Sequence, residues 1–310
     1  MLFIRQINNK MSFILKISKK IILQVIAIYV VPSLERPIRL QEYGVGIFDM
    51  LLTKSALKKA LKKELILVNG EIGRTSTFIK GGEQLELLAS TKAIRKKRLI
   101  LDLQVLYEDD YLAVVNKPAG ILVSGNSFKT VANALGQNLI PSKESDAVNP
   151  KPVHRLDYPT TGLLLVGKTN RSIVLLNRLF EEKKIIKAYH AVTIQKMKPK
   201  GTIVFPVDDK EAISGYEVLQ TVPSERFGHL NLVKLKPRTG RRHQLRKHLL
   251  ALGNPILGDA TYALDNLILK GKGLYLHASM LAFVHPFTKK QFQIECELPK
   301  KFAKLFDVNE

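Results

Sequence analysis

Hydrophobic and polar residues follow two different periods along this chain. Within residues 41–90, leucines recur every fourth residue from Leu57 to Leu65, which is the spacing of one helix face. Two strand-like runs follow, joined at Asn69-Gly70, and Asn-Gly is a strong signal for a two-residue hairpin. The pattern predicts a compact unit of two helices and a hairpin in this segment.

A second, larger unit has mostly strand-like patterns. Its expected strands lie in the runs VLYEDD, YLAVVNKP, GLLLVGK, KAYHAVTI, SGYEVLQTV, HLNLVKLKP and LYLHASMLAFVHP. Helical spacing occurs in KTVANALGQNL, in TNRSIVLLNRLFEEKKI with Asn170 or Ser172 as its cap, and in RRHQLRKHLLAL. Because strands outnumber helices and cluster apart from them, we predict an α+β fold, preceded by the small α/β unit.

These patterns place the expected boundaries. Residues 1–40 form an N-terminal extension in which the apolar run 21–31, at eleven residues, is too short to span a bilayer. No small-residue cleavage pattern follows it, so we expect a strand or an unstructured extension, although a peripheral membrane segment is an alternative. The small unit occupies 41–90. A charged linker is expected at 91–103, and the larger domain at 104–310.

The charge of the chain points to a polyanionic partner. It has 310 residues, with 49 Lys and Arg against 27 Asp and Glu, a net charge of +22. Such an excess attracts nucleic acid or an anionic membrane surface, and clustering of the lysines favours nucleic acid. The candidate RNA-binding residues lie on the predicted helix of the small unit: Lys54, Lys58, Lys59, Lys62 and Lys63. A merely solvated lysine face is the plain alternative.

The sequence lacks the motifs of several common classes of enzyme and metal site. The single cysteine, Cys296, excludes disulfide scaffolds and cysteine-based zinc sites, and its alternating surroundings QFQIECELP favour a packed thiol. The chain has no G-x-S-x-G, Walker or H-E-x-x-H pattern. His243 and His248 have no carboxylate or thiol at metal spacing, so we expect local hydrogen bonds or phosphate contacts and no metal there.

The segment VHRLDYPTTGLLLVGKT, residues 153–169, places Asp157 beside a strand that is apolar on both faces. A carboxylate there is costly to desolvate without a cation. Arg155 is near in sequence, and the segment 238–250 brings four further arginines: Arg238, Arg241, Arg242 and Arg246. Arg242 and Arg246 share a face if the helix has begun by then. An oriented carboxylate can be a nucleophile or part of a structural ion pair, and spacing leaves both open.

The segment HRLDYPTTGLLLVGKT resembles the catalytic motif of the RluA family of pseudouridine synthases. Further segments occur in the family's order: YEDDYLAVVNKPAGILV, KAYHAV, TGRRHQLRKHL, PILGDATY and LYLHASMLAFVHP. The segments KKELILVNGE and IKGGEQLEL resemble the S-four-like RNA-binding module. This resemblance favours RNA binding by the lysines over a merely solvated lysine face. The resemblance covers about residues 41–300. Arg242 stands where the family usually has Thr, which could change an RNA contact.

This resemblance implies the pseudouridine synthase fold for the larger domain, a mixed, mainly antiparallel sheet with flanking helices. It also implies isomerisation of uridine to pseudouridine in RNA, with no metal or organic cofactor. Asp157 would be the nucleophile, attacking the anomeric carbon of the ribose or, in an older proposal, the base. Tyr189 would stack on the flipped base and assist proton removal, and without the motif it would be a core aromatic. Arg246 would pair with Asp157, and Leu245 would line the uracil pocket.

The resemblance implies further substrate contacts from His154, Arg155, Arg241 and Lys117. Of these, the two arginines would meet phosphate or brace the catalytic loop, and Lys117 would shape a loop near the site. Ribosomal RNA of the large subunit is favoured over tRNA, because family members that act on it often carry the S-four-like module. A non-catalytic RNA-binding or ribosome-assembly factor is the alternative. We expect a cytoplasmic monomer that is not bound to membranes.

Overall fold

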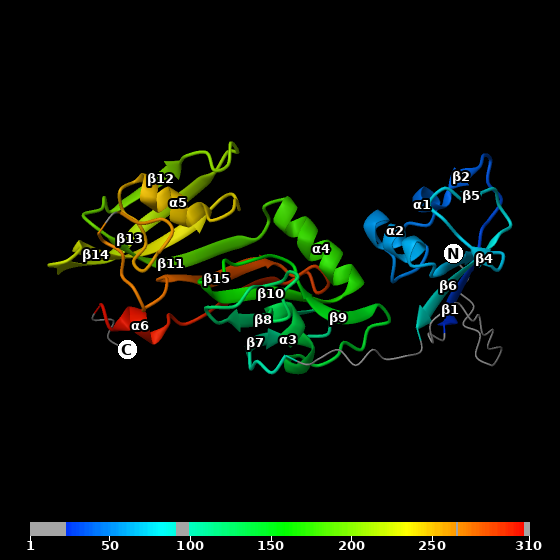
Figure 1. The fold of residues 1–310 in the computed structure, drawn as a ribbon, viewed down its shortest axis with the longest axis horizontal. Helices are drawn as coiled ribbons and strands as arrows, with labels where there is room; N and C mark the ends of the chain where they lie inside the picture. Colours follow the sequence, from blue (N-terminus) through cyan, green and yellow to red (C-terminus); the bar gives the residue numbers. More distant parts are fainter. Residues whose placement is uncertain (1–22, 91–98, 265, 307–310) are drawn as a thin grey trace. The chain divides into compact units, whose positions relative to one another are not determined.

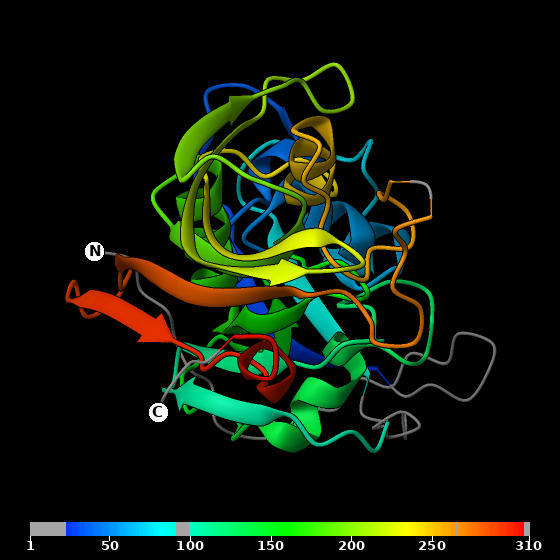
Figure 2. The same ribbon diagram turned by 90° about the vertical axis from the view of Figure 1, so that its left-hand side faces the viewer.

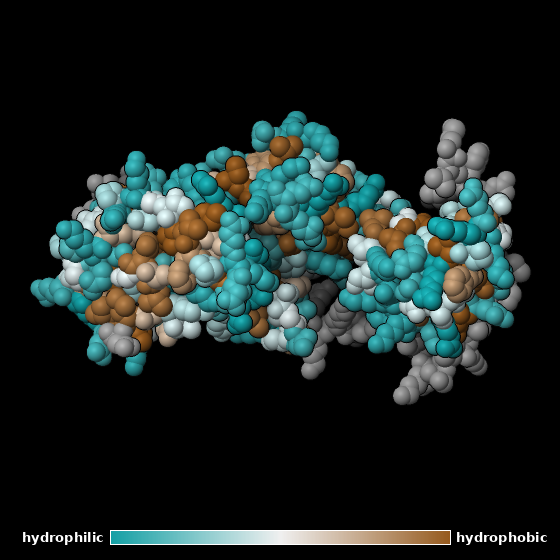
Figure 3. All heavy atoms as spheres, turned by 90° about the horizontal axis from the view of Figure 1, so that it is seen from above, coloured by the Kyte–Doolittle hydropathy of each residue, from teal (hydrophilic) through white to brown (hydrophobic). Residues whose placement is uncertain are grey.

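The computed structural model describes residues 23–90, 99–264 and 266–306 (Figure 1). The chain divides into an N-terminal unit, Met1–Lys97, and a C-terminal unit, Arg98–Glu310. Hydrophilic side chains cover much of the face of each unit that Figure 3 presents. None of the helices in the described ranges is long and apolar enough to cross a membrane.

The N-terminal unit is built on an antiparallel sheet with the strand order β1-β6-β3-β4. Its strands are β1 (Leu23–Val30), β3 (Ile66–Val68), β4 (Glu71–Ile72) and β6 (Gln84–Ser90), with the separate pair β2 (Ile38–Arg39) and β5 (Phe78–Ile79) and the helices α1 (Leu40–Tyr43) and α2 (Lys54–Lys62). The predicted hairpin is confirmed: Asn69 and Gly70, with φ of 51° and 83°, join β3 to β4. Two positive φ angles are what a type I′ turn requires.

Strand β1 moves the expected boundary of this unit. It pairs with β6 along its whole length, and Val31 after it is buried with Leu40 and Leu57. Residues 23–40 therefore belong to the N-terminal unit and are not an extension of it. The sequence pattern concealed this, because the outward-facing residues of β1 are also apolar: Ile26, Ile28 and Val30 are 39%, 52% and 62% exposed. Residues 1–22 lie outside the described ranges.

The C-terminal unit contains a ten-stranded sheet with the main order β12-β13-β14-β11-β15-β10-β8-β7 (Figures 1 and 2). The strands are β7 (Gln104–Glu108), β8 (Leu112–Lys117), β9 (Ala147–Pro152), β10 (Thr161–Thr169), β11 (Ile186–Ile194), β12 (Lys200–Val204), β13 (Ile213–Ser224), β14 (Gly228–Pro237), β15 (Leu276–Val284) and β16 (Gln291–Glu295). Strand β9 pairs with β10, and β16 with β15. Among the pairings of these strands in the described ranges, only β10 and β15 run parallel, so the predicted, mainly antiparallel α+β fold is confirmed.

Four helices accompany this sheet: α3 (Val131–Asn138), α4 (Asn170–Glu181), α5 (Gln244–Ala251) and α6 (Lys300–Ala303). The cap of α4 is Thr169, one residue before the expected Asn170, and Ser172 completes a capping box with it. Cys296 is partly buried, and burial raises the pKa of its thiol, as fits a packing role.

The end of the expected linker is part of the C-terminal unit. The backbone N–H of Leu103 donates to Asn138 Oδ1 of α3 at 2.9 Å, and Asn138 Nδ2 donates to the carbonyl of Leu101. Leu103 is buried against α3. Leu99, Leu101 and Leu103, which alternate along this stretch, all pack in the same core cluster. Residues 99–103 therefore belong to the C-terminal unit. The rest of the expected linker is basic, and its residues 91–98 lie outside the described ranges.

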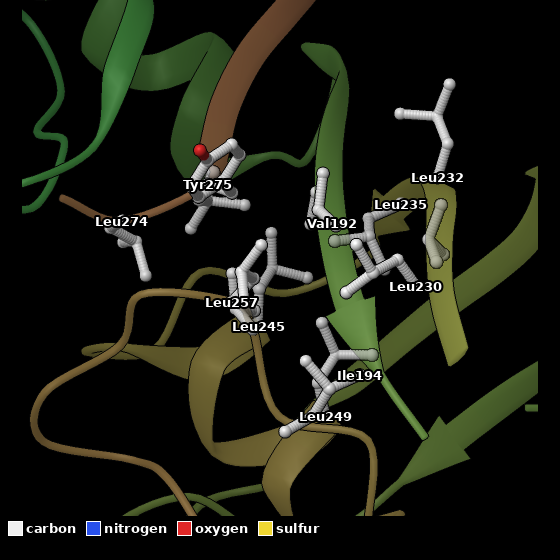
Figure 4. Close-up of a cluster of buried hydrophobic side chains, with 14 of the residues drawn as sticks. Val192, Ile194, Leu230, Leu232, Leu235, Leu245, Leu249, Leu257, Leu274 and Tyr275 are labelled. Atoms are coloured by element: carbon white, nitrogen blue, oxygen red, sulfur yellow. The ribbon is translucent and has the colours of Figure 1, made fainter. Parts of the chain in front are cut away.

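Helix α5 is anchored by its leucines. Leu245 and Leu249 are buried with Val192 and Ile194 of β11, and Figure 4 shows their side chains pointing into this cluster. Burial of a leucine side chain contributes roughly 1.5–3 kcal/mol. Because two neighbours of Arg246 are held in this way, the arginine has a fixed position at the start of the helix.

Candidate active site

A cavity of about 450 Å³ lies in the C-terminal unit, between the loop that precedes β10, strand β11 and the start of α5. Asp157, Tyr189, Leu245 and Arg246 all line it, although they are up to 89 residues apart in the sequence. The fold therefore brings together the four residues that carry the chemistry implied by the sequence resemblance.

Asp157 is positioned by a buried lysine. The side chain of Lys117 is fully buried, and its Nζ donates to the carbonyl oxygens of Pro118, Tyr158 and Thr160 at 2.9, 3.2 and 2.8 Å. Burial lowers the pKa of Lys117 to about 8, and the nearby charge of Asp157 partly opposes that shift. Because its side chain is fully buried, Lys117 is not placed to contact a substrate directly. Its hydrogen bonds agree with the other expected role, since they fasten the loop that carries Asp157.

Arg246 joins two carboxylates. Its Nε and Nη2 donate to the two oxygens of Asp259 at 2.6 and 2.7 Å, and its Nη1 lies 3.5 Å from Oδ2 of Asp157. Burial disfavours the charge of Arg246, but the hydrogen bonds and charge of Asp259, and then those of Asp157, raise its pKa. The expected pairing of Arg246 with Asp157 is present as the longer of the two contacts.

Sequence reasoning missed Asp259, the stronger partner of Arg246. The segment PILGDATY carries part of the family resemblance, but no pattern within it marks the aspartate as a partner for a residue of α5. The turn that it forms explains its position: Asp259 Oδ1 also accepts hydrogen bonds from the backbone of Thr261 and Tyr262, both at 2.9 Å. The carboxylate is thus fixed from two sides.

His243 faces the other oxygen of Asp157. It precedes α5 in the left-handed conformation, with φ of 55°, and its Nε2 lies 3.7 Å from Asp157 Oδ1. Its Nδ1 lies 3.0 Å from the hydroxyl of Tyr262, whose ring lies below the guanidinium of Arg246 at 4.8 Å. The expected local hydrogen bond is confirmed, and the proximity of His243 to Asp157 was missed. Burial lowers the pKa of His243, with Asp157 opposing the shift.

The turn before α5 corrects one expectation. The helix begins at Gln244, so Arg242 is outside it and does not share a helix face with Arg246. Gln244 holds this turn, accepting from the backbone N–H of Arg241 at 2.9 Å and from Thr239 Oγ1 at 2.8 Å. His248, further along the helix, is used locally, with Nε2 2.9 Å from the carbonyl of Phe205.

Tyr189 and Leu245 contribute apolar surface to the cavity. Tyr189 is half-buried on β11, and burial together with the charge of Asp157 raises the pKa of its phenol. The hydroxyl is therefore protonated at neutral pH and is not itself a resident base. Leu245 is 7% exposed, belonging to the core cluster while still lining the cavity.

The remaining expected contacts differ in accessibility. Arg155 and Arg241 are exposed at the cavity, and Arg241 Nε donates to the carbonyl of Glu211 at 3.1 Å. His154 lines the cavity, but its Nε2 accepts the backbone N–H of Leu165 at 2.8 Å. Burial and the charge of Lys187 lower the pKa of His154 to about 3. The neutral imidazole thus ties the loop to β10.

In the N-terminal unit, the α2 lysines are all exposed. Lys54 forms an ion pair with Glu42 at 2.6 Å. In the part of the chain that the structure describes, Lys58, Lys59, Lys62 and Lys63 form no ion pair. These four ammonium groups are available for an external anion.

Residues 111–251 match the family described as RNA pseudouridylate synthase. The chain is similar to ribosomal large subunit pseudouridine synthase C of Rickettsia felis, with 33% identity over 299 residues, covering 86% of this chain and 95% of that protein. It is also 33% identical over 242 residues to tRNA pseudouridine synthase C of Haemophilus influenzae, covering 66% of this chain and 97% of that protein. Among solved structures, human RNA pseudouridylate synthase domain containing 4 matches 64% of this chain and 90% of its own, with a TM-score of 0.51 and 25% identity.

Proposed function

Because the chain belongs to the RluA family of pseudouridine synthases, enzymes that isomerise uridine to pseudouridine in RNA, we propose that it modifies large-subunit ribosomal RNA with Asp157 as its nucleophile. One observation carries the assignment of Asp157. Its carboxylate lies in the cavity at 3.5 Å from Arg246, whose other nitrogens are already bound to Asp259. Arg246 can therefore orient the carboxylate without neutralising it by a tight bidentate pair.

In the proposed reaction, a carboxylate oxygen of Asp157 bonds to C1′ of the ribose while the bond between C1′ and N1 breaks, leaving the electron pair on uracil. The uracil turns, and its C5 bonds to C1′ as the bond to Asp157 breaks. The hydrogen on C5 leaves as a proton and N1 takes up a proton, so the net change is an isomerisation. Arg246 stabilises the carboxylate before attack and on release.

The cavity suits a base that has left its stack. Unstacking costs roughly a few kcal/mol, and stacking on an aromatic side chain returns about 1–3 kcal/mol. Tyr189 supplies such a ring on the cavity wall, and Leu245 supplies an apolar surface beside it. Since the phenol stays protonated, we assign Tyr189 to stacking and hydrogen bonding, and the proton from C5 goes to another acceptor.

The comparisons favour ribosomal RNA over tRNA as the substrate. The alignment with the Rickettsia felis enzyme spans 86% of the chain, which is more residues than the C-terminal unit holds, so it extends into the N-terminal unit. The alignment with the tRNA enzyme spans 66% of the chain. We propose that the N-terminal unit is an S-four-like RNA-binding module whose exposed α2 lysines contact phosphates. Action on ribosomal RNA would place the enzyme in the cytoplasm, and we propose that it acts there as a monomer.

The test is release of tritium from C5 of uracil. The purified enzyme is incubated with large-subunit ribosomal RNA and, separately, with tRNA, each labelled at C5. We expect release from ribosomal RNA, and loss of release by at least about 10³-fold in Asp157→Asn with RNA binding retained. Release by Asp157→Asn at the wild-type rate would refute the nucleophile, and release from tRNA alone would establish the tRNA alternative.

A further inference from the structure

Lys187 is a partly buried lysine on the wall of the cavity that contains Asp157. It lies on β11 two residues before Tyr189, and both residues line the cavity. Lys187 pairs with Leu281 of β15, and β14 joins the other side of β11 from Tyr189 onward, so the sheet holds the backbone that carries Lys187.

The charge of Lys187 is not balanced by any carboxylate within ion-pair distance in the described ranges. Its ammonium forms no ion pair or hydrogen bond among the residues that the structure describes, and Nζ lies over the ring of Phe180, 5.9 Å from the ring centre. Partial burial lowers the pKa of Lys187, with no acidic neighbour to oppose the shift. A half-buried ammonium without an anion is costly, which suggests that an anion is supplied from outside.

The surroundings of Lys187 favour an anion. The cavity is lined by Arg155, Arg241 and Arg242, whose guanidinium groups are not within 4.0 Å of a carboxylate in the described ranges. The turn that carries Arg241 and Arg242 lies close to this ammonium: a side-chain Cβ at Gly240 would stand 3.7 Å from Lys187 Nζ. The one carboxylate that lines the cavity, Asp157, is already faced by Arg246.

We propose that Lys187 is the centre of an anion subsite that binds a phosphodiester of the RNA next to the flipped uridine, with the exposed arginines at the cavity assisting. This inference rests on the proposed function and adds a substrate contact to it. A phosphate held on β11 beside Tyr189 would anchor the RNA backbone at the cavity equally before and during the attack of Asp157, so the subsite contributes to binding and not to the chemical step. The subsite also explains why a lysine stands on this strand without a hydrogen-bond or ion-pair partner among the described residues.

The test compares Lys187→Met with Lys187→Arg and with Lys184→Met. Lys184 is an exposed lysine three residues away that pairs with Glu182 and does not line the cavity, so it controls for the loss of one surface charge. Tritium release from labelled large-subunit ribosomal RNA is measured for each variant over 50–300 mM KCl. A phosphate contact changes the slope of log(kcat/KM) against log[KCl] by about 0.7–0.9.

We expect Lys187→Met to lose about that much slope and to raise KM several-fold, with kcat within twofold of wild type. Lys187→Arg is expected to keep the wild-type slope, as is Lys184→Met. An unchanged slope and KM in folded Lys187→Met would overturn the subsite, and so would a fall in kcat alone. If wild type releases no tritium from this RNA, the proposed substrate fails instead, which separates the two conclusions.

Discussion

Arg246 and Asp259 form a two-point ion pair, with hydrogen bonds of 2.6 and 2.7 Å between side chains that are 6% and 0% exposed. The pair links α5 to the turn before Tyr262 and leaves only one nitrogen of the guanidinium for the active cavity. Arg246 faces the proposed nucleophile Asp157, and its position therefore depends on Asp259, which does not itself line the cavity.

Asp259→Ala should destabilise the protein strongly. The substitution leaves the guanidinium of Arg246 buried with only the longer contact to Asp157, and breaking a buried pair costs about 3–5 kcal/mol. Urea unfolding measures the loss. Asp208→Ala is the matched control, since it removes a carboxylate from the exposed pair with Lys247, the next residue of α5. Equal losses in the two variants would contradict a special role of the buried pair.

His154 should make the stability depend on pH. Its Nε2 accepts a hydrogen bond from the backbone of Leu165, and a protonated ring cannot accept it. Its pKa falls from the ordinary 6.5 to about 3 in the folded protein, so the unfolded chain binds the proton first. Stability from this group is full above pH 6.5 and is lost as the pH falls toward 3.

The loss from this one group amounts to about 2 kcal/mol between pH 7 and pH 5. His154→Gln keeps an acceptor for the Leu165 N–H and removes the titrating ring. We expect the stability advantage of wild type over His154→Gln to shrink by that amount over this interval, as measured by urea unfolding at both values. A difference that does not vary with pH would show that the ring is not protonated on unfolding.

Local patterns predicted most of the fold. The Asn69-Gly70 hairpin and the helical spacing of the α2 leucines each depend on residues close in sequence, and the structure has both. Strand β1 was placed outside its unit because its side chains are apolar on both faces. Without alternation, sequence alone cannot indicate that a strand pairs with another some sixty residues later.

The sequence predicted those residues of the site that lie within recognisable motifs. Asp157 and Arg246 were matched through their segments, and the structure brings them together. Asp259 and His243 lie near Arg246 and Asp157 only because of the tertiary structure. Asp259 belongs to a turn 13 residues beyond Arg246, and His243 adopts a left-handed conformation just before α5. The burial of Lys117 was missed for a similar reason, since it follows from the packing of β8 and not from its neighbours in sequence.

Tyr189 should act through its ring. Because the pKa of its phenol is raised, the tyrosinate is not populated at neutral pH, and stacking on the base is the main contribution we expect. Tyr189→Phe keeps the ring and Tyr189→Leu does not. Stacking worth about 1–3 kcal/mol predicts a further loss of kcat/KM of about 5- to 150-fold in the leucine variant relative to phenylalanine. Equal activity of the two variants, measured by tritium release, would remove the stacking role.

The α2 lysines should contribute to RNA affinity in proportion to their availability. Replacing Lys58, Lys59 and Lys62 together by alanine removes three exposed charges that have no ion-pair partner among the described residues, whereas Lys54 is already paired with Glu42. Thr53 caps the helix and the leucine face is untouched, so α2 should remain folded. Filter binding to large-subunit ribosomal RNA at several salt concentrations measures the effect.

We expect the triple variant to bind more weakly and to lose about two units from the slope of log Kd against log[KCl], since each single-strand phosphate contact accounts for about 0.7. Lys54→Ala should change the slope much less, because its ammonium is shared with a carboxylate. Tritium release at saturating RNA should be retained in both variants, because the cavity residues all belong to the C-terminal unit. A triple variant with the wild-type slope would mean that α2 presents a solvated face and that RNA is held elsewhere.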